Sequence, residues 1–109
     1  MITKEKFCKF CETYMENSNK IEQAGKLLNF DFFCDDNAIS TTFYAIEQLL
    51  TELLFDKIQS KNPDADYDMF NEIIWDAIYY IFRKQPAHIP EKNITIYTYE
   101  ELYDLIETF

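Results

Sequence analysis

The stretch from Asp64 to Lys84 constrains the fold most strongly, because two different patterns run along it. Carboxylates recur there at steps of four residues, at Asp64, Asp68, Glu72 and Asp76, and we call these four residues the acidic ladder. Apolar residues recur at steps of three and four, the period of one buried helix face, at Tyr67, Phe70, Ile73, Ile74, Ala77, Ile78, Ile81 and Phe82. The stretch therefore predicts one helix with a core-facing side and an acidic side in solvent.

Composition favours helices for the rest of the chain as well. The sequence has one glycine and three prolines in 109 residues, too few for the many tight turns of a sandwich or barrel. Its ten phenylalanines and eight tyrosines can fill an aromatic core without disulfides. We predict a single domain over residues 1–109, mostly α, built as a compact bundle of four or five helices with a small two-stranded hairpin before the C-terminal helix.

Capping signals and prolines set the predicted boundaries. Thr3 and Ser40 are suited to cap helices, and Thr98 forms a capping box with Glu101. The predicted helices run over about 3–17, 21–28, 41–60, 64–84 and 98–108. Short, partly β-branched segments, Ala87–Ile89 and Ile94–Tyr97, flank a polar turn and predict the hairpin. This hairpin must pack on the helices, because an isolated one is marginally stable.

Negative charge is concentrated in the last three quarters of the chain. Residues 1–30 carry five lysines against four glutamates, whereas residues 31–109 carry five basic against sixteen acidic side chains. Such a surface repels nucleic acid, because phosphate binding depends on lysine and arginine. It can instead attract a protein with a basic surface, since the long-range field steers their encounter.

No export or membrane-insertion signal is apparent. The first residues hold no apolar run of signal-peptide length, and the longest uninterrupted apolar run, from Ala77 to Phe82, is too short to span a bilayer. We therefore expect a cytoplasmic protein that does not bind membranes, in which the cysteines are thiols.

Cysteine and histidine residues offer a weak signal for chemistry. Cys8 and Cys11 have the spacing of zinc and redox motifs, and a zinc-dependent regulator would need Cys34 and His88 as further ligands. The other interpretation places Cys11 in the apolar face of the first helix with Cys8 beside it. A lone histidine without a nucleophile motif does not indicate a general base, and one glycine cannot build a phosphate loop. We predict no enzyme activity and no cofactor.

The acidic ladder is the most specific feature of the sequence. Four residues at 1.5 Å rise separate successive carboxylates by about 6 Å, which resembles the spacing of phosphates along a nucleic-acid strand. With Glu100, Asp104 and Glu107 of the last helix, the ladder could compete for a basic nucleic-acid groove. The other interpretation is that the ladder is only the solvated side of an amphipathic helix.

Part of the chain resembles small uncharacterised proteins of phages, prophages and mobile elements in low-GC Gram-positive bacteria. The resemblance covers about the last 65 residues and is carried by Ile46-x-x-Leu49-Leu50, Trp75-Asp76-x-Ile78-x-Tyr80-Ile81 and Thr98-Tyr99-Glu100-Glu101-Leu102-Tyr103-Asp104-Leu105-Ile106. Related proteins often read D-x-I-x-Y-F-I-x-E, then a hairpin, then T-x-E-x-L-Y-D. This chain departs from them at Arg83 and Lys84, where they often have an acidic residue and an aromatic-glycine pair.

The resemblance implies a phage-type context in a bacterial host, where small acidic proteins that block defence complexes are common. The expected function is a non-enzymatic, anti-CRISPR-like inhibitor that mimics nucleic acid and occupies a basic groove of a host complex. A structural or homo-oligomeric module is the first alternative, with an aromatic contact formed by some of Phe30, Phe32, Phe33, Tyr79 and Tyr80. The zinc-dependent regulator is the second.

Overall fold

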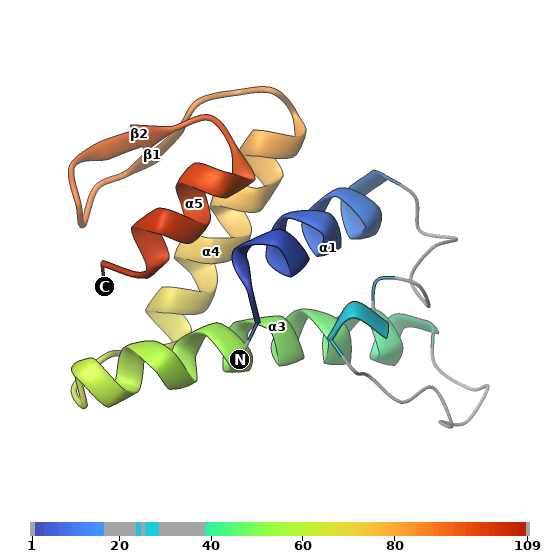
Figure 1. Cartoon of the computed structure of the whole chain (residues 1–109), viewed down its shortest axis with the longest axis horizontal. Helices are drawn as coiled ribbons and strands as arrows, with labels where there is room; N and C mark the ends of the chain where they lie inside the picture. The colour runs from blue at the N-terminus through green and yellow to red at the C-terminus, as the bar shows by residue number, and fades with distance from the viewer. Residues whose placement is uncertain (1, 17–23, 25, 29–38, 109) are drawn as a thin grey trace.

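The predicted fold class is confirmed by the structure, a computed structural model that describes residues 2–16, 24, 26–28 and 39–108. The elements are α1 (Lys4–Glu16), α3 (Ile39–Lys61), α4 (Tyr67–Phe82), β1 (Ala87–Ile89), β2 (Ile94–Ile96) and α5 (Tyr99–Ile106) (Figure 1). The candidate contact residues Phe30, Phe32 and Phe33 and the candidate zinc ligand Cys34 lie outside the described residues, as do residues 21–23 and 25 of the helix predicted over 21–28.

The helices pack around one apolar centre, with α3 along one side of the molecule and the hairpin packed on α4 (Figure 1). Helix α1 packs along α5, while α4 contacts α3, α5 and strand β1. Every one of these elements contributes to the core, whose largest fully buried side chains include Phe7, Phe10, Ile46, Leu50, Ile74, Ile78, Ile96, Leu102 and Ile106. Each such side chain contributes roughly 1.5–3 kcal/mol by leaving water.

The predicted Thr3 and Thr98 caps are confirmed, but the capping box differs from the prediction, because the Glu101 carboxylate accepts from the backbone N–H of Tyr97 and not from that of Thr98. The Thr3 hydroxyl accepts a hydrogen bond from the backbone N–H of Lys6 at 3.2 Å, and α1 follows. The Thr98 hydroxyl accepts from the backbone N–H of Glu101 at 3.1 Å, while the Glu101 carboxylate accepts from the backbone N–H of Tyr97 at 3.3 Å. Helix α3 begins at Ile39, two residues before the predicted start at Thr41, so Ser40 lies inside its first turn.

Helix α4 begins three residues later than predicted, because Asp66 caps it. The Asp66 carboxylate accepts from the backbone N–H groups of Asp68 and Met69 at 2.9 and 3.3 Å. Asp64 lies before this cap in a turn, where its N–H is 3.3 Å from the Asn62 side-chain oxygen and the N–H of Ala65 is 3.1 Å from the Asn62 carbonyl. The first carboxylate of the acidic ladder is therefore not on the helix.

A residue in the left-handed conformation follows the end of α4, two positions beyond Phe82. Lys84 has φ 59°, its N–H donates to the carbonyl of Ile81 at 2.9 Å, and the N–H of Gln85 donates to that of Tyr80 at 2.9 Å. These two bonds form a Schellman motif, whose left-handed position glycine usually occupies. The chain takes this turn although Lys84 carries a side chain, which the left-handed conformation disfavours.

The hairpin forms as predicted, except that Tyr97 lies beyond β2. Its strands are antiparallel, with Ala87 opposite Ile96 and Ile89 opposite Ile94. Asn93 ends the four-residue turn at φ 49°, a conformation that asparagine tolerates better than most residues. Ala87, Ile89 and Ile96 are buried, so the hairpin is held by packing on the helices.

A polar network in the core fixes α4 against α3. The Trp75 indole N–H donates to the Thr51 hydroxyl oxygen at 3.0 Å, and the Thr51 hydroxyl lies 2.7 Å from the side-chain oxygen of Asn71. Thr51 is fully buried and Trp75 nearly so. This network sets the rotation of α4 about its axis, and with it the direction in which the acidic ladder points.

Candidate functional site

Three carboxylates of the acidic ladder lie on the outer side of α4. Asp68, Glu72 and Asp76 are exposed, while Ile74 and Ile78 on the opposite side are fully buried. Asp64 is exposed as well, in the turn before the helix. Helix α4 therefore has the predicted buried side and acidic side, and its acidic side carries three of the four ladder carboxylates.

No cation neutralises these three carboxylates within the described part of the chain. The ion pairs among those residues join other partners, Lys4 with Asp104 and Lys57 with Glu107. Adjacent ladder carboxylates repel one another by about 0.2–0.5 kcal/mol per pair at this spacing. The outer side of α4 therefore presents unpaired negative charge to solvent.

The ladder runs obliquely around α4, because four residues exceed one turn of 3.6 residues and each step advances by about 40°. Asp68 borders a hollow against α3, where Glu47 and Gln48 also lie. Asp76 borders a groove against β1, beside His88. The ladder thus spans the exposed side of α4 from its contact with α3 to its contact with the hairpin.

Large apolar side chains stand among the ladder carboxylates. The exposed fractions are 49% for Met69, 41% for Tyr79, 45% for Tyr80 and 44% for Phe82. The prediction that Phe82 faces the core is wrong, because Phe82 is the last residue of α4 and is exposed there, whereas Ile81 beside it is buried. The outer side of α4 therefore combines unpaired charge with exposed aromatic and methionine side chains, and side chains of these apolar types are enriched at protein contact surfaces.

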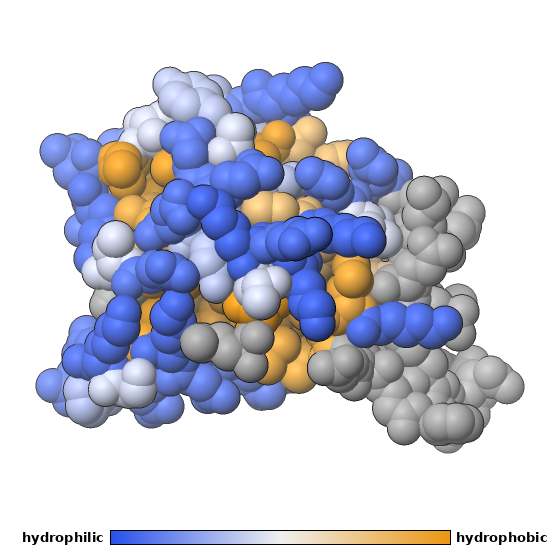
Figure 2. All heavy atoms as spheres, viewed as in Figure 1, coloured by the Kyte–Doolittle hydropathy of each residue, from blue (hydrophilic) through white to orange (hydrophobic). Residues whose placement is uncertain are grey.

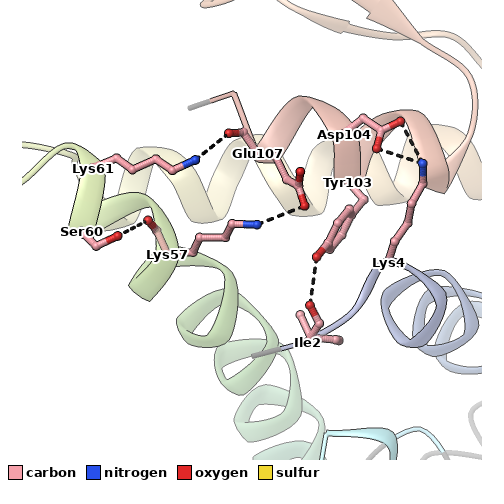
Figure 3. A network of polar contacts seen from close by, with 8 residues as sticks. All are labelled: Ile2, Lys4, Lys57, Ser60, Lys61, Tyr103, Asp104 and Glu107. Atoms are coloured by element: carbon pink, nitrogen blue, oxygen red, sulfur yellow. Dashed lines mark hydrogen bonds and ion pairs between the residues drawn. The ribbon is translucent and has the colours of Figure 1, made fainter.

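Two of the three predicted carboxylates on α5 are already engaged within the molecule (Figure 3). Asp104 is 2.9 Å from the Lys4 ammonium, and Glu107 is 3.0 Å from that of Lys57. The backbone oxygen of Glu107 also accepts from the Lys61 ammonium at 3.2 Å. These lysines offset the charge of α5, so the structure does not join α5 and the ladder into one uniformly acidic surface.

The contacts of α5 also join the two ends of the described chain. The Tyr103 hydroxyl donates to the backbone oxygen of Ile2 at 3.0 Å, next to the ion pair of Lys4 with Asp104 (Figure 3). Asp104 and Glu107 thus have a structural role that their outward positions in the sequence pattern did not reveal.

In the same orientation as Figure 1, hydrophilic side chains cover much of the surface, with apolar residues between them (Figure 2).

The two cysteines of α1 are buried thiols. Burial, followed by the nearby Glu100 carboxylate, raises the pKa of Cys8 to about 11, and burial raises the pKa of Cys11 well above its usual value. Thiolate is the reactive and metal-binding form, so both groups are held in the unreactive form at neutral pH. Among the described residues, no group of three or more His, Cys, Asp or Glu side chains is arranged to hold a metal ion.

His88 lies on the exposed side of β1, where its Nδ1 is 3.2 Å from the Thr95 hydroxyl across the hairpin. This contact joins the two strands. The zinc alternative also needs Cys34, which is outside the described residues.

Sequence reasoning missed Met69, Glu91 and the groove that they line with His88. Met69 offered a signal, since it is a large apolar residue directly after a ladder carboxylate. Glu91 offered none, because its place beside α4 depends on how the hairpin packs.

Comparison with protein families, with curated proteins and with solved structures finds no match to this chain. Within the described residues, no helix combines the length and apolar character needed to cross a membrane.

Proposed function

We propose that this protein is a non-enzymatic inhibitor of phage or mobile-element type, which occupies the basic nucleic-acid groove of a host complex with the outer side of α4. Asp68, Glu72 and Asp76 supply the contact charges, and Asp64 extends them at one end. One observation carries the proposal: the three helix carboxylates are exposed and have no cation within ion-pair distance among the described residues.

Charge of the whole chain supports the same proposal. The formal net charge is −10 at pH 7, so the field attracts a basic surface over several ångströms and repels nucleic acid. Asp104 and Glu107 contribute less than the ladder, because lysines lie against them. Glu100, Asp104 and Glu107 therefore form a secondary part of the proposed contact.

The test is capture of partners from a bacterial lysate with three forms of the protein. The ladder variant carries Asp68→Asn, Glu72→Gln and Asp76→Asn. The α1 variant removes the same number of charges from another helix, through Glu5→Gln, Glu12→Gln and Glu16→Gln, which are all exposed. Wild type and the α1 variant should retain the same nucleic-acid-binding proteins, and the ladder variant should lose them. Retention by all three forms would refute the proposal.

The ladder variant is a fair probe because its stability should match that of wild type. Neutral side chains relieve the repulsion between neighbours, about 0.2–0.5 kcal/mol per pair. They also remove the favourable interaction of Asp68 with the helix N-terminus, about 0.3–1 kcal/mol. These effects oppose one another, and equal thermal midpoints would show that lost capture reflects lost charge.

Homo-oligomerisation is the second candidate, favoured by the exposed Met69, Tyr79, Tyr80 and Phe82 on the same helix. Sedimentation at low and high salt separates it from the first. An apolar dimer persists in high salt, whereas a complex held by charge dissociates as the salt screens it.

A further inference from the structure

A groove lies between the outer side of α4 and strand β1, with a volume of about 290 Å³. Its floor consists of buried residues with small or aliphatic side chains, Ala77, Ala87 and Ile89. One alanine lines the groove from α4 and the other from β1, and their short side chains leave space there. The volume lies at the lower limit of small-molecule pockets, about 300 Å³, so it suits a single long side chain.

The rim of this groove is acidic on both sides. Glu72 and Asp76 stand on α4, and Glu91 stands on the hairpin turn. All three are exposed, and the described residues that line the groove include no lysine or arginine. A cation in the groove would therefore meet carboxylates from two separate elements.

The rest of the rim is apolar and aromatic. Met69 and Tyr80 line the groove from α4, and each leaves more than two fifths of its surface in solvent. Such side chains can cover the aliphatic stem of a long basic residue, and the tyrosine ring can stack on a planar cation. Apolar walls and acidic ends together match a side chain that is apolar along its length and cationic at its tip.

We propose that the groove between α4 and β1 binds one arginine side chain of the partner protein. This inference rests on the proposed function and specifies its contact. The guanidinium has donors in a fixed planar fork, which can reach carboxylates on both sides of the groove and stack on Tyr80, whereas a lysine ammonium is a point charge that does neither as well. Its aliphatic stem lies over the two alanines.

The experiment uses the full chain labelled with ¹³C at its methionine methyl groups and three capped peptides, acetyl-Gly-Ala-X-Ala-Gly-amide. X is arginine, lysine or citrulline, which is the neutral counterpart of arginine. The Met69 methyl at the rim reports binding, and the Met15 methyl on α1 is the internal control. Arginine should shift the Met69 signal in a saturable way, lysine should bind more weakly, and citrulline and the Met15 signal should show no effect.

Matched charge variants then locate the site. Asp76→Asn should weaken arginine-peptide binding by about tenfold, the loss expected for one hydrogen bond to a charged group. Asp56→Asn makes the same change at an exposed residue of α3 that does not line the groove, and its effect should stay below about twofold. Unchanged spectra of Met15 in both variants confirm an intact fold.

Three outcomes would overturn the inference: no saturable shift with the arginine peptide, equal weakening by the two variants, or binding of lysine as tightly as arginine. Each leaves the proposed function standing, because that proposal is judged by lysate capture with the ladder and α1 variants. Conversely, failure of lysate capture together with a groove specific for arginine would refute the inhibitor proposal while retaining the site.

Discussion

Replacing Thr51 by valine tests the network that orients the ladder helix. The Thr51 hydroxyl oxygen accepts from the Trp75 indole N–H at 3.0 Å and lies 2.7 Å from the Asn71 side-chain oxygen, at a fully buried position. Valine has nearly the same shape and supplies a methyl group in place of the hydroxyl. The substitution therefore removes the hydrogen bonds while keeping the packing.

The expected cost comes from the groups left behind. A buried donor without a partner costs about 1–3 kcal/mol, which applies in full to the Trp75 indole, whereas the half-buried Asn71 can turn toward water. We expect Thr51→Val to lower the free energy of unfolding by about 2 kcal/mol. At roughly 2.1 cal/mol/K of unfolding entropy per residue, this lowers the midpoint by about 9 °C.

Thermal and urea unfolding followed by circular dichroism measure this loss. The control is Thr51→Ser, which keeps the hydroxyl and removes one buried methyl group, at a cost of about 1 kcal/mol. The account predicts that valine destabilises the protein more than serine does. The opposite order would refute the reasoning, because it would show that the methyl group matters more than the hydrogen bonds.

Three further predictions concern α4 and α1. Lys84→Gly should raise the free energy of unfolding by about 1 kcal/mol, since the residue is left-handed, whereas Lys84→Ala should not raise it. Calorimetry measures both variants, and an equal effect of the two substitutions would contradict the Schellman motif. Asp66→Ala should cost about 1 kcal/mol in urea unfolding by removing the α4 cap, and no loss would contradict the cap. Cys8, with a pKa of about 11, should react with iodoacetamide at pH 8 at least 100-fold more slowly than a free thiol. Its reaction rate should rise about tenfold per pH unit toward pH 11. Peptide mass mapping measures this rate, and a plateau by pH 9 would contradict the raised pKa.

Local patterns were sufficient to predict most of the fold. The three- and four-residue spacing in α4 identified Phe70, Ile74 and Ile78 as core, and hydroxyl side chains at Thr3 and Thr98 marked two helix starts. The apolar spacing and the helix caps both depend on residues a few positions apart, so they can be identified from the sequence alone. The hairpin was predictable for the same reason, because its strands are close in the chain.

Contacts between distant segments account for what was missed. Trp75 is buried against α3, where the Thr51 hydroxyl accepts its indole N–H, and Phe82 is exposed at the last residue of α4. The engagement of Asp104 by Lys4 joins residues at opposite ends of the chain. The groove likewise depends on the packing of the hairpin on α4, and no spacing rule within either segment predicts it.

Competition with nucleic acid tests the central claim most directly. The measurement is the concentration of this protein that displaces half of a labelled nucleic acid from the captured partner, for wild type, the ladder variant and the α1 variant. The account predicts equal values for wild type and the α1 variant, and a value about tenfold higher for the ladder variant, from roughly 0.5 kcal/mol per lost charge. Displacement by the ladder variant at the wild-type concentration, or equal weakening of both variants, would contradict it.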